Sequence, residues 1–386
     1  MLRTRTAFFV AALASACHST TGPTYVDRDG WRTHEAFAGE VRLSGVACGD
    51  IDPRSPGDEL VAVGELGRIT YARCVGGAFE SEVIAETGGE LLQVAVGDVD
   101  RERPGAEIVA VGVLTGTEEE LGEGAAWLLR RSADGAGGFE REVLAQSPAL
   151  IHAVVIGDLD PATPGNEVAL AGFTREVTLV TRTPEGFAAR VIAKLPANAK
   201  GMAATARGLV VACDNGALVW LARPSEAGAE WNTARVWRGE APLARVATRP
   251  DEVLVCGNDG VLRLFQTKSD EAFERETRCV ALDDRLRGAV FADVDPRSPG
   301  TEAATAGYDG TVRVVRLEPW PVAADLVPAS AGLVNYRVIE DIAAEDTAKL
   351  HHLASGRFDG LGTCLVSAGY SGRVLVVHRI AADVAR

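Results

Sequence analysis

The stretch "GDIDPRSPGDELVAV", residues 49–63, returns as "ADVDPRSPGTEAATA" from Ala292, far downstream in the same chain. Two further copies lie between them, "GDVDRERPGAEIVAV" from Gly97 and "GDLDPATPGNEVALA" from Gly157. Each copy keeps two aspartates, a Pro-Gly pair and a glutamate at the same spacing. Self-similarity at intervals of a few tens of residues is typical of repeat architectures, in which each copy is one small structural unit. We therefore expect one body built from repeated units.

Each acidic turn lies between two short apolar runs, such as "LLQVAV" before it and "EVALAG" after it. A Gly-centred turn and an alternating run such as "TVRVVR" follow. Period-two alternation between turn signals predicts antiparallel strands. A fourth segment begins with an aromatic residue, and these residues are Phe79, Phe139, Phe187, Trp231, Phe273 and Tyr336. Each unit is thus predicted to contain four strands.

The two ends of the chain complement each other. Units four and five lack the acidic turn but keep the rest of the pattern, in "GLVVACDNGALVWLAR" and "EVLVCGNDGVLRLFQ". The seventh unit, which begins at His351, provides three strands, and the N-terminal "DGWRTHEAFA" has the form of the missing fourth, with Trp31 in the aromatic place. The sequence predicts an all-β, seven-bladed β-propeller of four-stranded antiparallel blades, with the ring closed by an N-terminal strand in the last blade. Two packed sandwiches would leave that displaced strand unexplained. An insertion in unit two, "TGTEEELGEGAA", is interpreted as a solvated loop.

The N-terminus has the layout of an export signal. Arg3 and Arg5 precede an apolar run from Ala7 to Ala16 that is too short to span a bilayer. The sequence "LASAC", which ends at Cys17, resembles the lipobox of bacterial lipoproteins, although Ala14 stands where that family prefers Leu. The resemblance implies a signal peptide over residues 1–16, a lipid on Cys17, a tether over 17–28 and one propeller over 29–386. The alternative is an ordinary signal peptide.

Both interpretations export the protein, and with the lipid it becomes a periplasmic or outer-membrane and cell-surface lipoprotein of a bacterium. The formal net charge of −15 argues against nucleic acid or an anionic membrane as a partner. Contact with a membrane is expected only through the N-terminal lipid, and the chain is expected to be a monomer. The six cysteines after Cys17 lack metal-site spacing and are predicted to be buried free thiols.

The acidic turn follows the pattern DxDPxxPGxE. Calcium binds six to eight oxygens from carboxylates, carbonyls and water, and three clustered carboxylates repel one another without a cation. We predict up to four structural calcium ions, held by Asp50, Asp52 and Glu59; Asp98, Asp100 and Glu107; Asp158, Asp160 and Glu167; and Asp293, Asp295 and Glu302. The alternative is that the aspartates cap a turn through hydrogen bonds to the backbone.

These turns carry a family resemblance. "GDxD" before "LVAVG" resembles the FG-GAP or VCBS repeat of calcium-binding propellers, and the longer pattern is similar to the repeats of bacterial rhamnogalacturonan lyases. The resemblance implies calcium in the turns. The sequence departs from the pattern at Arg101, where Pro is usual, and at Arg357, which replaces the first Asp of unit seven. Four sites are therefore expected rather than seven.

A ligand site is predicted at one mouth of the central channel, which the first strand of each blade lines. Counting back five residues from the start of each acidic turn gives Ser44, Leu92, His152, Arg287 and His351. His152, Arg287 and His351, with His352 next to them, are the candidate site for an acidic or sugar ligand. The alternative is a water-filled channel that tolerates polar side chains at little cost.

The chain lacks GxSxG, HExxH, P-loop and redox CxxC motifs. The function that the sequence favours is therefore a non-catalytic binding or scaffold module for a protein or glycan at the cell envelope. The alternative is a polysaccharide-active, lyase-like enzyme with its site at the same channel mouth.

Overall fold

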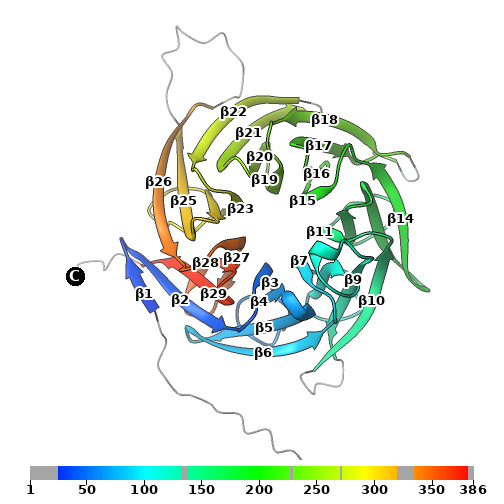
Figure 1. Cartoon of the computed structure of the whole chain (residues 1–386), viewed down its shortest axis with the longest axis horizontal. Helices are drawn as coiled ribbons and strands as arrows, with labels where there is room; N and C mark the ends of the chain where they lie inside the picture. The colour runs from blue at the N-terminus through cyan, green and yellow to red at the C-terminus, as the bar shows by residue number, and fades with distance from the viewer. Residues whose placement is uncertain (1–24, 133–137, 227–228, 270–271, 320–333, 381–386) are drawn as a thin grey trace, which may run out of the picture.

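The computed structural model describes residues 25–132, 138–226, 229–269, 272–319 and 334–380. The predicted signal peptide, Cys17 and residues 17–24 of the tether lie outside the described residues. Seven sheets stand radially around a common axis, with the first strand of each blade innermost (Figure 1). Contacts between successive innermost strands run around the full ring, including the contact of β27 with β3. The fold is the predicted all-β seven-bladed propeller.

The first six blades follow the chain in order. Blade 1 contains β3 (Leu43–Gly49), β4 (Glu59–Gly64), β5 (Arg68–Val75) and β6 (Ala78–Glu86), and blade 2 contains β7 (Leu91–Gly97), β8 (Glu107–Val113), β9 (Gly124–Arg131) and β10 (Phe139–Ser147). Blade 3 contains β11 (Ile151–Gly157), β12 (Glu167–Gly172), β13 (Glu176–Thr183) and β14 (Gly186–Lys194), and blade 4 contains β15 (Ala199–Thr205), β16 (Gly208–Cys213), β17 (Ala217–Ala222) and β18 (Asn232–Arg238). Blade 5 contains β19 (Leu243–Arg249), β20 (Glu252–Gly257), β21 (Val261–Ser269) and β22 (Ala272–Ala281), and blade 6 contains β23 (Leu286–Ala292), β24 (Glu302–Gly307), β25 (Thr311–Pro319) and β26 (Tyr336–Glu345). Two short 3-10 helices lie in connections between strands: η1 (Glu65–Gly67) between β4 and β5, and η2 (Glu118–Glu120) between β8 and β9.

Blade 7 closes the ring with both ends of the chain. It consists of β27 (Leu350–Phe358), β28 (Gly362–Gly369), β29 (Arg373–Arg379) and the N-terminal β2 (Trp31–Ala38). β2 pairs antiparallel with β29, from Trp31 opposite Arg379 to Ala38 opposite Arg373. A short strand, β1 (Tyr25–Arg28), pairs with the outer edge of β2. The four residues of β1 were predicted to lie in the tether over residues 17–28, but they belong to the sheet.

The core is divided into layers between neighbouring blades. Seven hydrophobic clusters each join side chains of two successive blades. The second strands, such as β4 and β12, are buried along their whole length because a blade covers each of their faces. Trp31 is fully buried between blades 6 and 7. The six cysteines of the described residues are free thiols; five are buried, as predicted, and Cys48 is only partly buried.

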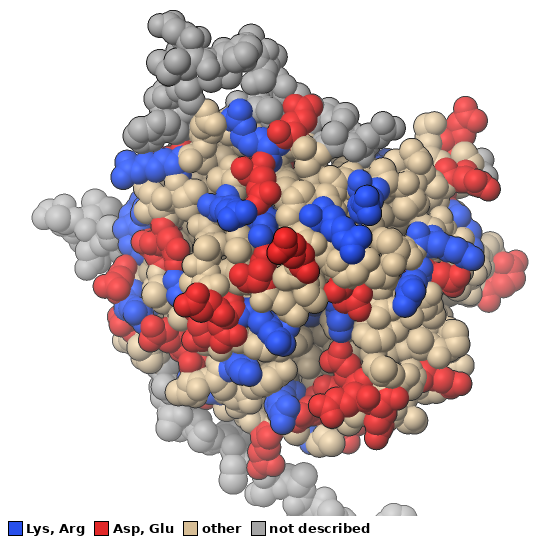
Figure 2. Space-filling view, turned by 45° about the horizontal axis from the view of Figure 1, so that its top comes forward, with Lys and Arg blue, Asp and Glu red and all other residues tan. Residues whose placement is uncertain are grey.

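The acidic turns and the Gly-centred turns lie on opposite faces of the ring. β3 runs from Leu43, which pairs with Gly64 next to the Gly-centred turn, to Gly49, which pairs with Glu59 at the acidic turn. On the face that Figure 2 shows, acidic and basic side chains are interspersed. Among the described residues, no helix is long and apolar enough to cross a membrane.

Candidate functional site

A β-bulge occurs at the same place in all seven blades. The pairing of each innermost strand with its neighbour skips the strand's second residue. The skipped residues are Ser44, Leu92, His152, Lys200, Ala244, Arg287 and His351. A bulge leaves one residue unpaired and redirects its side chain, which is a common device beside functional sites. The ring of positions predicted by counting is thus a ring of bulges at the channel mouth.

Three of the predicted ligand residues line one cavity. His152, Arg287 and His351 face a space of about 190 Å³ at the start of the innermost strands. The remaining polar and aromatic side chains of the lining are Glu118, Lys200, Arg245, Asn258, Tyr308 and Tyr370. The cavity therefore combines cationic, aromatic and amide groups from several blades.

His352 does not line this cavity. It is buried in the wall, and its Nδ1 atom accepts a hydrogen bond of 3.3 Å from the backbone N–H of Val46 in blade 1. The reason is the bulge, which turns His351 toward the channel and leaves His352 in the ladder opposite Ala368. We therefore remove His352 from the candidate site.

The cavity carries an excess of positive charge. The lining contains three cationic side chains, Lys200, Arg245 and Arg287, and one carboxylate, that of Glu118. Burial lowers the pKa of Arg245 to about 10, which leaves it charged at neutral pH. Burial, with the nearby cations, lowers the pKa of His351 to about 3 and that of His152 well below its usual range. Both histidines are therefore neutral partners rather than additional cations.

Arg245 is buried with open hydrogen-bond donors. The residue is 4% exposed. Its Nη1 atom donates to the carbonyl oxygens of Lys200 at 2.7 Å and Ala244 at 3.0 Å. Its Nε and Nη2 atoms have no partner within the described part of the chain. A buried donor without an acceptor costs about 1–3 kcal/mol, so these two unpaired donors are unusual in a folded protein.

Two tyrosines and a histidine form an aromatic wall. The His351 ring stacks on Tyr370 with centroids 5.6 Å apart, and the hydroxyl groups of Tyr308 and Tyr370 are 3.2 Å apart. His351 Nδ1 donates to the Ser44 carbonyl oxygen at 3.0 Å, so that Nε2 keeps its lone pair. Burial raises the pKa of Tyr308, but hydrogen bonds with Tyr370 and Arg287 outweigh it and bring that pKa below its ordinary value.

A small apolar cluster lies beside the cavity. Leu92, Val113 and Leu150 form a buried cluster with Phe173, on blades 2 and 3. Lys200 Nζ lies 4.7 Å from the centre of the Phe173 ring. The apolar cluster is thus in contact with the cationic lining of the cavity.

The acidic turns on the other face are closed by arginines and backbone amides. Glu59 Oε2 accepts the backbone N–H groups of Ile51 and Asp52, both at 2.9 Å. Asp52 Oδ1 accepts a hydrogen bond of 2.8 Å from Arg54 Nε, and Asp52 also forms an ion pair with Arg131 at 3.2 Å. Glu107, Glu167 and Glu302 repeat the first arrangement in their own turns. The first aspartates, Asp50, Asp98, Asp158 and Asp293, are exposed to solvent.

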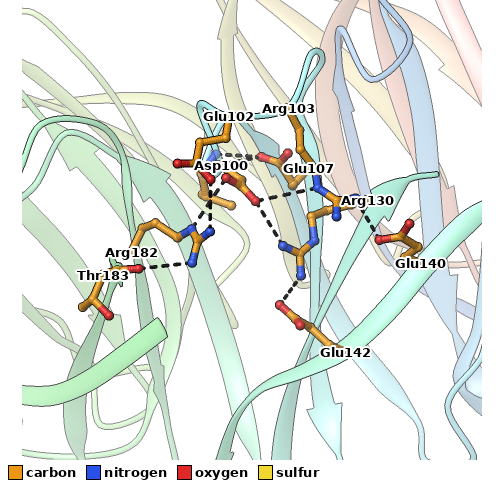
Figure 3. A network of polar contacts seen from close by, with 10 residues as sticks. Asp100, Glu102, Arg103, Glu107, Arg130, Glu140, Glu142, Arg182 and Thr183 are labelled. Atoms are coloured by element: carbon orange, nitrogen blue, oxygen red, sulfur yellow. Dashed lines mark hydrogen bonds and ion pairs between the residues drawn. The ribbon is translucent and has the colours of Figure 1, made fainter. Parts of the chain in front are cut away.

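Asp100 is surrounded by three arginines (Figure 3), although its Oδ1 atom has no hydrogen-bond partner among the described residues. Arg130 lies 3.1 Å from the Asp100 carboxylate, Arg182 3.6 Å and Arg103 4.0 Å. Among the described residues, no group of three or more His, Cys, Asp or Glu side chains is placed to hold a metal. Arginines contact the second aspartate of each turn, whereas Glu59 Oε1 and Asp100 Oδ1 are buried without a hydrogen-bond partner among the described residues. Calcium binding at these turns stays a prediction from the sequence.

Six polar or aromatic residues of the lining were not predicted from the sequence, among them Lys200, Arg245, Tyr308 and Tyr370. Lys200 occupies the bulge position of blade 4, which has no acidic turn from which to count. Arg245 follows the bulge residue Ala244 in blade 5, where the same rule also fails. Tyr308 and Tyr370 follow the last glycine of the second strand in "AGYDG" and "AGYSG". That repeated Gly-Tyr signal, one step before a Gly-centred turn, could have identified both tyrosines.

No protein-family model matches the chain, and a search of curated proteins finds no match. Among solved structures the chain is similar to the crystal structure of the WD40 beta propeller domain of Doa1, with 11% sequence identity and a TM-score of 0.56. The likeness covers 89% of this chain and 98% of that one. Since 1092 solved chains match, it identifies a widespread architecture rather than an activity. The comparisons thus show the fold alone, that of a β-propeller.

Proposed function

We propose that the protein is a non-catalytic binding module that captures a carboxylate-bearing ligand at the mouth of its central channel. The observation that carries this proposal is the buried guanidinium of Arg245, which lines the cavity beside the cations Lys200 and Arg287. Its Nε and Nη2 donors have no hydrogen-bond partner among the described residues. Guanidinium groups bind carboxylates through paired, charge-assisted hydrogen bonds. An anionic group in the cavity would satisfy donors that the protein leaves open.

The rest of the lining favours an acidic sugar as the carrier of that carboxylate. The rings of Tyr308 and Tyr370 provide an aromatic surface for a sugar ring. Arg287 Nη1 donates a hydrogen bond of 2.6 Å to the side-chain oxygen of Asn258, so the Asn258 NH₂ group can donate to a sugar hydroxyl group. A cavity of about 190 Å³ is the size of one sugar ring rather than of a folded partner's surface. A terminal hexuronate of an acidic glycan therefore fits better than a protein segment.

Export and a lipid on Cys17 complete the proposal. They rest on the charged and apolar layout of residues 1–17. A lipid there would tether the ring at the cell envelope, where an acidic glycan would be the ligand. Metabolic labelling with a fatty acid, in cells that make the wild-type chain or Cys17→Ser, tests this part separately.

Isothermal titration calorimetry with glucuronate and with glucose tests the binding proposal. The two sugars share a ring and differ in the carboxylate, so we expect glucuronate to bind and glucose to bind at least tenfold more weakly. Arg287→Met should weaken glucuronate binding at least tenfold, because a charge-assisted hydrogen bond contributes about 1.5–3 kcal/mol. Arg285→Met, which removes the same charge from an exposed position outside the lining, is the matched control. Equal binding of both sugars, or equal losses in both variants, would contradict the proposal.

One observation favours a second function, that of a lyase acting on the same ligand. Elimination beside a uronate carboxylate needs a cation to neutralise the carboxylate and a base to take the neighbouring proton, while the C–O bond to the leaving sugar breaks and a C=C bond forms. Arg287 and Tyr308, whose pKa is lowered, have those properties and interact with each other. An unsaturated product from a polyuronate, lost in Tyr308→Phe, would show an enzyme. Binding without product is what we expect.

A further inference from the structure

The acidic insertion of unit two is mostly exposed, as predicted for a solvated loop, but the side chain of Glu118 within it is half-buried. The insertion folds back over the channel mouth, and its turn η2 follows a capping box in which Thr117 and Glu120 satisfy each other's backbone N–H groups. The backbone N–H of Glu118 donates to Glu90 Oε2 at 2.8 Å, and Leu114 N–H donates to the Glu123 carbonyl oxygen at 2.6 Å. The position of the turn is thus fixed by contacts that do not involve the Glu118 side chain.

The Glu118 carboxylate reaches into the cationic cavity. It accepts a hydrogen bond from Lys200 Nζ at 3.0 Å and lies 3.7 Å from His152 Nε2. These contacts extend from blade 2 to blades 3 and 4. Glu118 and Lys200 keep about a third and a quarter of their side chains exposed, at 34% and 23%. A partly exposed ion pair of this kind contributes only about 0–1 kcal/mol to folding stability.

We infer that Glu118 is a built-in competitor for the ligand carboxylate and thereby sets the specificity of the site, an inference that rests on the proposed function. Among the described residues that line the cavity it is the one carboxylate, and it already neutralises one of the three cations. A ligand anion must displace it from Lys200 or bind beside a like charge. Neutral sugars cannot displace the Glu118 carboxylate from Lys200. Anions that interact weakly with Arg245 and Arg287 gain too little binding free energy to displace it.

The chemistry explains why this exchange is feasible. The Lys200 ammonium has three donors on a flexible stem, so it can transfer from one carboxylate to another without movement of the backbone. The exposed fraction of the pair keeps the exchange open to solvent. Arg245 and Arg287, which have no contact with Glu118 among the hydrogen bonds of the described residues, provide the fixed part of the site.

Calorimetric titration of glucuronate into the wild-type chain, Glu118→Gln and Glu119→Gln tests this inference. Glu119 lies on the same turn, is exposed and is absent from the lining, so its variant matches the charge change. We expect Glu118→Gln to bind glucuronate about tenfold more tightly than the wild type. The ligand then no longer has to break the charge-assisted hydrogen bond between Lys200 and Glu118, and one such bond corresponds to about tenfold in affinity. Glu119→Gln should bind like the wild type. Thermal unfolding of all three chains checks that the turn remains folded.

The possible results separate this inference from the proposed function. Wild-type binding that is unchanged in Glu118→Gln, or weakened by it, overturns the competitor role and leaves the binding site in place. Equal gains in both variants would show a general charge effect and would also overturn it. Absence of glucuronate binding in all three chains contradicts the proposed function itself, and the competitor role with it.

Discussion

The Nε2 atoms of His34 and His378 lie 3.2 Å apart, across the pair of strands that closes the ring. Their rings are stacked with centroids 5.3 Å apart, and His34 is 6% exposed. Burial and the neighbouring His378 lower the pKa of His34 to about 4, and burial lowers the pKa of His378 as well. Such a contact needs one protonated and one free nitrogen, so the seam is built for neutral imidazoles.

Acid should therefore weaken the closing seam. Between pH 6.5 and 4 the unfolded chain protonates its histidines while His34 in the folded chain stays neutral. The unfolded state therefore binds more protons, and the free energy of unfolding decreases as the pH is lowered. Arg32, close by, disfavours a second positive charge, whereas Asp27 partly offsets it. We expect a loss of roughly 1–2 kcal/mol from this residue between pH 7 and pH 5.

Denaturant unfolding of the wild type and His34→Phe at both pH values measures this contribution as a difference. The difference is needed because Glu107, whose pKa burial raises to about 7, changes stability in the opposite direction with pH. The same loss in both chains would show that His34 does not sense pH.

Trp31 should contribute strongly to closure of the ring. It is fully buried in the cluster between blades 6 and 7, although it lies on the N-terminal strand. We expect Trp31→Ala to lower the free energy of unfolding by about 3–5 kcal/mol, because it leaves a cavity and weakens the docking of β2. Val26→Ala, at a position that is 66% exposed on β1, should change it by less than about 0.5 kcal/mol. Urea unfolding compares the two, and similar small losses would argue against closure through β2.

The acidic turns offer a matched test of arginine against calcium. Asp295 is fully buried and accepts Arg297 Nε at 2.8 Å and Nη2 at 2.7 Å, whereas Asp293 in the same turn is exposed. We expect Asp295→Asn to cost about 1.5–3 kcal/mol, the contribution of hydrogen bonds to a charged group, and Asp293→Asn to cost little. If the arginines alone hold the turn, a calcium chelator leaves the melting temperature of the wild type unchanged.

Calcium would give a different pattern. Both aspartates would then matter, and a chelator would lower the melting temperature by several degrees until calcium is restored. That result would establish the calcium site predicted from the sequence, and it would require the arginines to leave Asp52, Asp100, Asp160 and Asp295.

The fold could be predicted because its determinants are local and repeated. Alternating apolar residues, the aromatic start of each fourth strand and the displaced segment at Trp31 are visible in any one unit and its copies. The position of β1 was missed, since "YVDR" is too short and polar to show a strand pattern. Its pairing with β2 decides its conformation.

The site was only partly predictable because its contacts join distant units. Counting from the acidic turns located His152, Arg287 and His351, but the rule fails in the two blades that contribute Lys200 and Arg245. The ion pair of Arg131 with Asp52 joins blades 2 and 1, and Glu118 reaches Lys200 two blades away. Such contacts depend on how the blades are placed around the ring, which the residue pattern of one unit does not contain.

A crystal structure of the chain with bound glucuronate is the most direct measurement of the central claim. We expect the carboxylate to lie within hydrogen-bonding distance of the Arg245 and Arg287 guanidinium groups. The sugar ring should then pack against Tyr308 and Tyr370. A glucuronate seated elsewhere, such as the groove lined by Trp220 and Thr248 between blades 4 and 5, would contradict it.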